Sequence, residues 1–170
     1  TYYRKGDVEK AASNFEQLVA LQPQEPVLRE NLAGIYMELG RVAPAITQYE
    51  QLLKLRPDNG RACERLAFIY AACPEDALRN GARAIDLARR GVQLADGKDP
   101  LVLRTLAAAL AESGQFEAAL QTLQRGLPLA IAGSNAALVE ELQGELLLYQ
   151  SRQPLRDPGL TAASGRGAGR

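Results

Sequence analysis

The chain has 170 residues, with 20 basic side chains, 20 acidic side chains and no histidine. A net charge of zero removes the general case for binding nucleic acid or an acidic membrane surface, because both require a basic protein surface. The absence of histidine removes most acid/base and metal chemistry, so we expect no catalytic residues, no metal site and no cofactor. The length is typical of about one domain.

The composition favours helices. Hydrophobic residues make up 46% of the chain and aromatic residues only 5%, and alanine and leucine are the most frequent residues. No apolar run approaches the roughly 20 residues of a membrane span, so we expect no direct membrane insertion. Cys63 and Cys73 lack a CxxC spacing. We therefore expect no disulfide framework, and a cytoplasmic and a periplasmic location both stay open.

The sequence repeats with a period of 34 residues. Identical residues stand 34 apart at several places, among them Gly6 and Gly40, Leu18 and Leu52, and Pro23 and Pro57. After Tyr70 the spacing lengthens by six, so that Leu66 corresponds to Leu106. Within each period apolar residues lie three and four apart, which indicates two short amphipathic helices. A fixed period of this length is typical of stacked helical hairpins.

The pattern predicts eight helices in chain order. They are expected at 8–22, 26–39, 43–56, 60–73, 82–95, 100–113, 116–131 and 135–150, with one extra turn inside the insertion at 73–81. Ser134 is expected to cap the last helix. Pro128 is expected to kink or end the preceding helix, because it lacks an N–H and clashes with the carbonyl of Gln124.

Six alanines recur at equivalent positions and are expected where paired helices approach closely. They are Ala33, Ala67 and Ala107 on the first helices, and Ala45, Ala84 and Ala119 on the second helices. The chain then divides into a partial repeat (1–25), three repeats (26–59, 60–99 with the insertion, and 100–134) and a capping helix (135–150). Together these form one domain, 1–150. Residues 151–170 are rich in Pro, Gly and Arg, and we expect a disordered basic tail there.

The repeated residues resemble the tetratricopeptide repeat, whose pattern is W-x2-L-G-x2-Y, then A-x3-F, then P. One period reads Leu32-Ala33-x2-Tyr36, then Ala45-x3-Tyr49, then Pro57, and the next two begin Leu66-Ala67-x2-Tyr70 and Leu106-Ala107-x2-Leu110. Arg29, Cys63 and Leu103 replace the Trp. The resemblance implies an all-α, right-handed α-solenoid with a capping helix. It implies a non-enzymatic scaffold that binds a protein or peptide in a concave groove.

The stretch 73–82, continuing to 148–149, also resembles the end of multi-repeat bacterial proteins. In such proteins the repeats are often fused to a membrane glycosyltransferase, a sulfatase or a peptidase. This resemblance implies a bacterial origin and a larger parent protein. Because the chain begins at Thr1 without Met or a signal sequence, we expect a piece of a longer protein or a processed one.

The resemblance also implies which side chains face the groove. Six of them are the candidate binding residues: Asn31, Met37, Arg61, Arg65, Phe68 and Arg104. Asn31, Arg61 and Arg65 match positions at which some family members grip a terminal carboxylate, and guanidinium groups bind carboxylates through two hydrogen bonds. The alternative is a solvated surface on which Arg61 or Arg65 pairs with Glu30 or Glu64. The general weakness of surface charge pairs favours this alternative.

A second functional hypothesis concerns the first, incomplete repeat. Phe15, Leu18, Val19 and Leu21 are expected to leave an exposed apolar edge, which is a self-association risk. The chain would then be a structural or oligomerisation appendage of a larger bacterial enzyme, with a homo-oligomer formed through the open N-terminal repeat.

Tyr36 and Tyr70 are expected in the core.

Overall fold

The computed structural model describes residues 5–161 of the chain. This part consists of eight α-helices and two short 3-10 helices, and it contains no strand. The helices are α1 (Lys5–Leu21), α2 (Pro26–Glu38), α3 (Val42–Leu55), α4 (Gly60–Ala72), α5 (Gly81–Leu94), α6 (Pro100–Glu112), α7 (Phe116–Ala132) and α8 (Ala136–Gln150). The 3-10 helices are η1 (Asp76–Leu78), inside the insertion, and η2 (Pro158–Leu160). Each expected helix is present, and its ends agree within about three residues.

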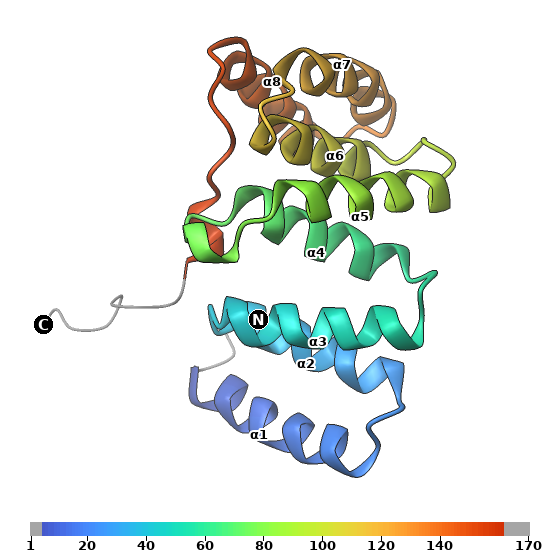
Figure 1. Cartoon of the computed structure of the whole chain (residues 1–170), viewed down its shortest axis with the longest axis vertical. Coiled ribbons are helices and arrows are strands. Elements are labelled where there is room, and N and C mark those ends of the chain that lie inside the picture. Colours follow the sequence, from blue (N-terminus) through green and yellow to red (C-terminus); the bar gives the residue numbers. More distant parts are fainter. Residues whose placement is uncertain (1–4, 162–170) are drawn as a thin grey trace, which may run out of the picture.

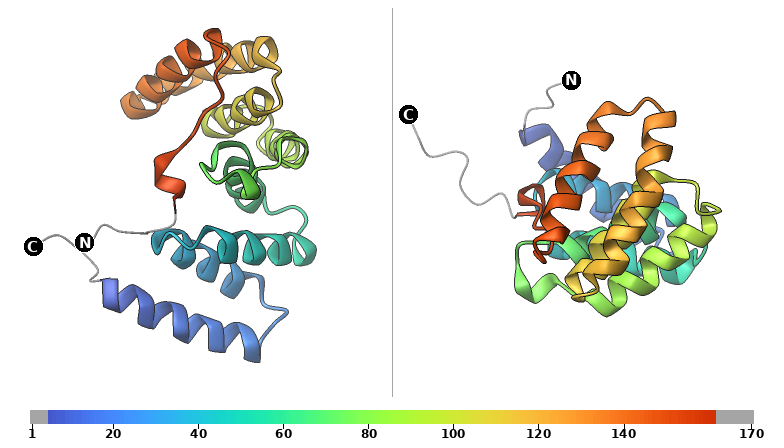
Figure 2. Two further views of the ribbon diagram at one scale, coloured as in Figure 1. Left: turned by 60° about the vertical axis from the view of Figure 1, so that its left-hand side comes forward. Right: turned by 90° about the horizontal axis from the view of Figure 1, so that it is seen from above.

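The helices form antiparallel hairpins stacked on one another, α2 with α3, α4 with α5 and α6 with α7 (Figure 1). The stack curves, with α1 at one end and α8 at the other (Figure 2). The fold is an all-helical solenoid, as predicted. All six recurring alanines are fully buried: Ala33, Ala45, Ala67, Ala84, Ala107 and Ala119. A methyl group at these points lets the helix backbones approach closely.

One hydrogen bond recurs with the period of the sequence. The Tyr36 hydroxyl donates to Glu16 at 2.9 Å and joins α2 to α1. The Tyr70 hydroxyl donates to Glu50 at 2.7 Å and joins α4 to α3 in the same way. Both tyrosine rings are buried. Each ring therefore packs in the core, while its hydroxyl ties one hairpin to the preceding helix.

Near the last helices the expected cap is wrong, and the early end of α7 expected as one effect of Pro128 is absent. Asn135, not Ser134, is the N-cap of α8, and its side chain accepts a hydrogen bond from the Leu138 amide at 3.1 Å. Ser134 has a positive φ of 52°, which fits the tight turn but not a cap. Pro128 does not end α7, which continues to Ala132. Pro128 and Gln124 are both exposed, so water can satisfy the carbonyl that Pro128 leaves without a donor.

The expectation of a disordered tail from residue 151 is wrong for residues 151–161. This segment, here called the strap, runs back from α8 along the inside of the curve (Figure 2). The Asp157 amide donates to the Ala72 carbonyl at 2.9 Å, and the Leu160 side chain is buried. Residues 162–170 of the expected tail lie outside the described residues. The strap is ordered because it buries a leucine and forms hydrogen bonds that its composition alone does not reveal.

Candidate functional site

A pocket of about 600 Å³ lies where the N-terminal turns of α4 and α6 meet the C-terminal turn of α5. Its lining combines charged and apolar side chains: Asp58, Gly60, Arg61, Glu64, Arg65, Gly91, Leu94, Ala95, Asp99, Leu101 and Val102. Asn59 caps α4 and Asp99 caps α6, and each side chain accepts a backbone N–H of its own helix. These caps fix the two helix ends that form the walls of the pocket.

Arg61 and Arg65 both line this pocket, and both are only loosely paired. Their side chains are 74% and 51% exposed, respectively. Arg61 lies 3.6 Å from a carboxylate oxygen of Glu30, and Arg65 lies 3.5 Å from one of Glu64. These distances exceed those of a good charge-assisted hydrogen bond. The Arg61–Glu30 pair is the more exposed of the two and contributes little stability. Glu64 is buried, but the Arg65 side chain is half-exposed, so both guanidinium groups can reach a further carboxylate from solvent.

Glu64 is the buried acid at the floor of the pocket. Its side chain is 8% exposed and accepts a hydrogen bond from the buried Thr105 hydroxyl at 2.9 Å, which links α4 to α6. Burial raises the pKa of Glu64, although Arg65 and the Thr105 hydroxyl act in the opposite direction. Because Asp58, Glu64 and Asp99 also line the pocket, its charge is mixed and not uniformly positive.

Arg104 does not extend the groove as a free cation, which corrects our expectation. Its guanidinium lies 2.6 Å from Glu145 and 3.0 Å from Glu141, both on α8, and its side chain is only 15% exposed. It also lies 5.1 Å from the centre of the Phe68 ring. Arg104 therefore fastens the last helix to the stack through an ion pair and a cation–π contact.

The remaining candidate residues do not gather at the pocket. Asn31 is exposed on α2 and is not part of the pocket lining. Met37 and Phe68 are half-buried and pack against the hydrophobic core. The structure thus brings two of the six candidates, Arg61 and Arg65, into one site.

The comparisons with known proteins agree with the sequence pattern. Residues 2–66 match the family model described as tetratricopeptide repeat. This segment consists of tetratricopeptide repeats. Tetratricopeptide repeats are generally non-catalytic protein-interaction modules. A search of the curated proteins gave no match.

Solved structures share the fold across most of the chain. One structure of MamA is 15% identical, covers 89% of this chain and 96% of its own, and has a TM-score of 0.64. MamA 41-end from Desulfovibrio magneticus RS-1 is 17% identical, with 88% and 89% covered and a TM-score of 0.62. PilW, a widely conserved type IV pilus biogenesis factor, is 18% identical, with 86% and 70% covered and a TM-score of 0.58. At these identities the likeness concerns the fold.

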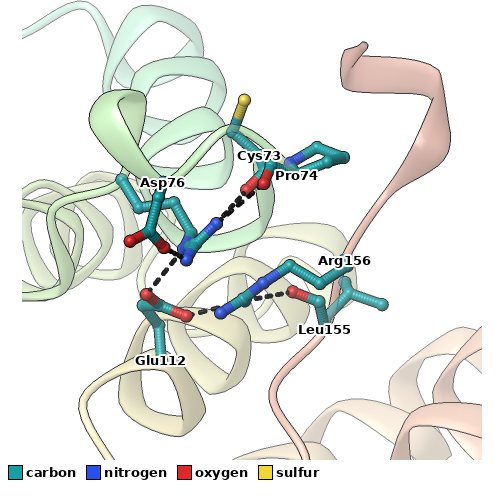
Figure 3. Close-up of polar contacts among 7 residues, drawn as sticks. Cys73, Pro74, Asp76, Glu112, Leu155 and Arg156 are labelled. Carbon is teal, nitrogen blue, oxygen red and sulfur yellow. Dashed lines mark hydrogen bonds and ion pairs between the residues drawn. The ribbon is translucent and has the colours of Figure 1, made fainter.

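The opposite end of the helical hairpins holds a second polar cluster, shown in Figure 3. Glu112, at the C-terminal end of α6, contacts Arg79 at 2.9 Å through one oxygen and Arg156 of the strap at 2.7 Å through the other. Arg79 also donates to the carbonyls of Cys73 and Pro74 and pairs with Asp76. Sequence reasoning missed this cluster because its members come from three segments without a shared spacing.

Cys63 and Cys73 are fully buried, and burial raises the pKa of both thiols. A raised pKa lowers the thiolate fraction on which cysteine reactivity depends. Among residues 5–161, no group of acidic or cysteine side chains could hold a metal ion. In the same range, no helix is both long and apolar enough to cross a membrane.

Proposed function

We propose that this chain is an interaction scaffold that binds an extended protein segment at the pocket between α4 and α6. The observation that carries the proposal is the pair of mostly exposed guanidinium groups, Arg61 and Arg65, beside the exposed apolar side chains of Leu94 and Leu101. A partner carboxylate would replace Glu30 or Glu64 at the guanidinium groups, and an apolar partner residue would contact the two leucines. The preferred partner is an extended segment with an acidic residue next to an apolar one.

A selection from a phage-displayed library of random peptides tests this proposal. The unchanged chain should enrich peptides that contain an acidic residue beside an apolar one. Arg61→Glu and Arg65→Glu should lose at least about tenfold in affinity for the selected peptides, because like charges then face each other. Arg89→Glu, at an exposed position of α5 outside the pocket, is the matched control and should bind normally. Equal binding by all three variants, with unchanged helix content, would refute the groove assignment.

A second candidate function is self-association through α1, as an appendage of a larger bacterial enzyme. Leu18, Leu21 and Val27 are exposed by 38%, 78% and 63%, and they are the observation that favours it. Phe15 and Val19, which we expected on the same edge, instead pack against the core. Light scattering across a range of concentrations tests this candidate. A dimer that Leu21→Glu dissociates would support it, and a monomer at every concentration would exclude it.

A further inference from the structure

The strap contacts the solenoid at two recognisable points. The first is polar: the Arg156 guanidinium pairs with Glu112 at 2.7 Å, at the C-terminal end of α6. The second is apolar: the Leu160 side chain is 6% exposed, and its carbonyl accepts from the Cys73 thiol, at the C-terminal end of α4. Between these points, the Asp157 amide donates to the Ala72 carbonyl. The surface formed by Ala72, Cys73 and Glu112 is here called the rim dock.

The rim dock has the properties of a peptide site. It combines a carboxylate for a basic side chain, a main-chain acceptor and an apolar position for a leucine four residues further along. The carboxylate is held in place because Arg79 binds its other oxygen and is itself anchored to the carbonyls of Cys73 and Pro74 (Figure 3). A preorganised acceptor of this kind loses little entropy when a cation binds.

We propose that the rim dock is a second peptide-binding site, which the strap occupies as a built-in competitor. The partner that displaces the strap is an extended protein segment with the same chemistry, a basic residue followed four positions later by leucine. The site is separate from the pocket at Arg61 and Arg65, since α4 has 13 residues and its two ends are about 18 Å apart. A tethered competitor acts at a high effective concentration. A partner segment therefore displaces the strap only when its affinity and concentration together outweigh those of the tethered strap.

A labelled peptide with the sequence of residues 153–161 tests this proposal by fluorescence anisotropy. The full chain with Arg156→Ala and Leu160→Ala, whose strap is weakened, should bind the peptide at least about tenfold more tightly than the unchanged chain. Adding Glu112→Gln to that variant should remove most of this binding, because the dock loses its negative charge. Arg152→Ala is the matched control, since this exposed strap residue pairs with Glu117 outside the dock. A peptide carrying the same two alanine substitutions should not bind.

A second form of the experiment keeps the native strap. A site-specific protease sequence inserted between Arg152 and Gln153, which are exposed, lets the folded chain be cut beside the strap. The cut strap should dissociate on dilution, and the labelled peptide should replace it, as followed by native mass spectrometry. The proposal is overturned if the weakened variant keeps its helix content but binds no peptide. It is also overturned if the cut strap neither dissociates nor exchanges.

Discussion

Arg104 and Glu145 are 41 positions apart in the sequence, yet their side chains meet at 2.6 Å and join α6 to α8. Glu145 is almost fully buried, so the pair lies largely outside the reach of solvent. Burial raises the pKa of the Glu145 carboxyl, and the Arg104 guanidinium opposes this rise. The contact turns an arginine that the repeat pattern places in the groove into the attachment point of the last helix.

Replacing Arg104 by methionine should lower the free energy of unfolding by about 3–5 kcal/mol, because Glu145 would be left buried without its cation. Urea denaturation measures the change. The double variant Arg104→Met, Glu145→Leu should regain most of the loss, since apolar groups can replace a buried pair. Arg152→Met, which removes a mostly exposed pair with Glu117, is the control and should change stability by less than about 1 kcal/mol. Equal effects at both sites would contradict this account.

The buried carboxyl of Glu64 should give the protein a recognisable pH dependence. Burial raises the pKa of Glu64 above its ordinary value of 4.5, so the folded state binds this proton more tightly than the unfolded state. Stability should therefore decrease as the pH rises from about 4.5 through the folded-state pKa. In Glu64→Gln this decrease should be smaller. Denaturant midpoints from about pH 4.5 upward measure it, and identical profiles for the two proteins would contradict the prediction.

Glu50 should act in the opposite sense at lower pH. The Tyr70 hydrogen bond lowers the pKa of Glu50 below 4.5, against the effect of burial and with help from Arg83. Its contribution to stability is present above pH 4.5 and is lost as the pH falls through the folded-state pKa. Tyr70→Phe should therefore reduce the acid sensitivity of unfolding below this pH. An unchanged acid limb in Tyr70→Phe would show that the hydrogen bond does not act on Glu50.

Ala67→Arg tests the contact between paired helices. Ala67 is fully buried in α4, and an arginine there would overpack the interface and bury a charge. The cost should be on the order of 3 kcal/mol or more. Thermal melting measures it against Ala20→Arg, at an exposed alanine of α1, which should melt near the unchanged chain. Equal melting temperatures of the two variants would mean that Ala67 does not lie at the contact between the paired helices.

Alanine substitutions at two glycines distinguish the effect of available space on stability from the effect of backbone conformation. An added methyl group would meet no atom within 4 Å at either Gly144 or Gly114, but Gly114 has a φ of 76°. Gly144→Ala should stabilise α8 by roughly 0.5–1 kcal/mol, because alanine is the better helix former. Gly114→Ala should cost about 1–2 kcal/mol through strain. Melting temperatures that move in the same direction would contradict this distinction.

The sequence by itself determined the helices, their pairing and the buried alanines. This information is local and periodic: a repeat contacts mainly its neighbours, so a pattern 34 residues long specifies both the hairpin and its stacking. Even Tyr36 and Tyr70, with their partners Glu16 and Glu50, recur at this spacing. Arg61 and Arg65 line one pocket because they are four residues apart and so lie on one face of α4.

Only the tertiary structure determined the partners of Arg104 and the ordered position of the strap. Both depend on contacts between segments that do not repeat: 41 residues separate Arg104 from Glu145, and 87 separate Cys73 from Leu160. Composition gives the average tendency of a segment to bury apolar surface, but a short segment becomes ordered when a single leucine and a single ion pair find matching sites elsewhere. Those sites exist only after the hairpins have stacked, because stacking is what brings the ends of α4 and α6 to the same rim.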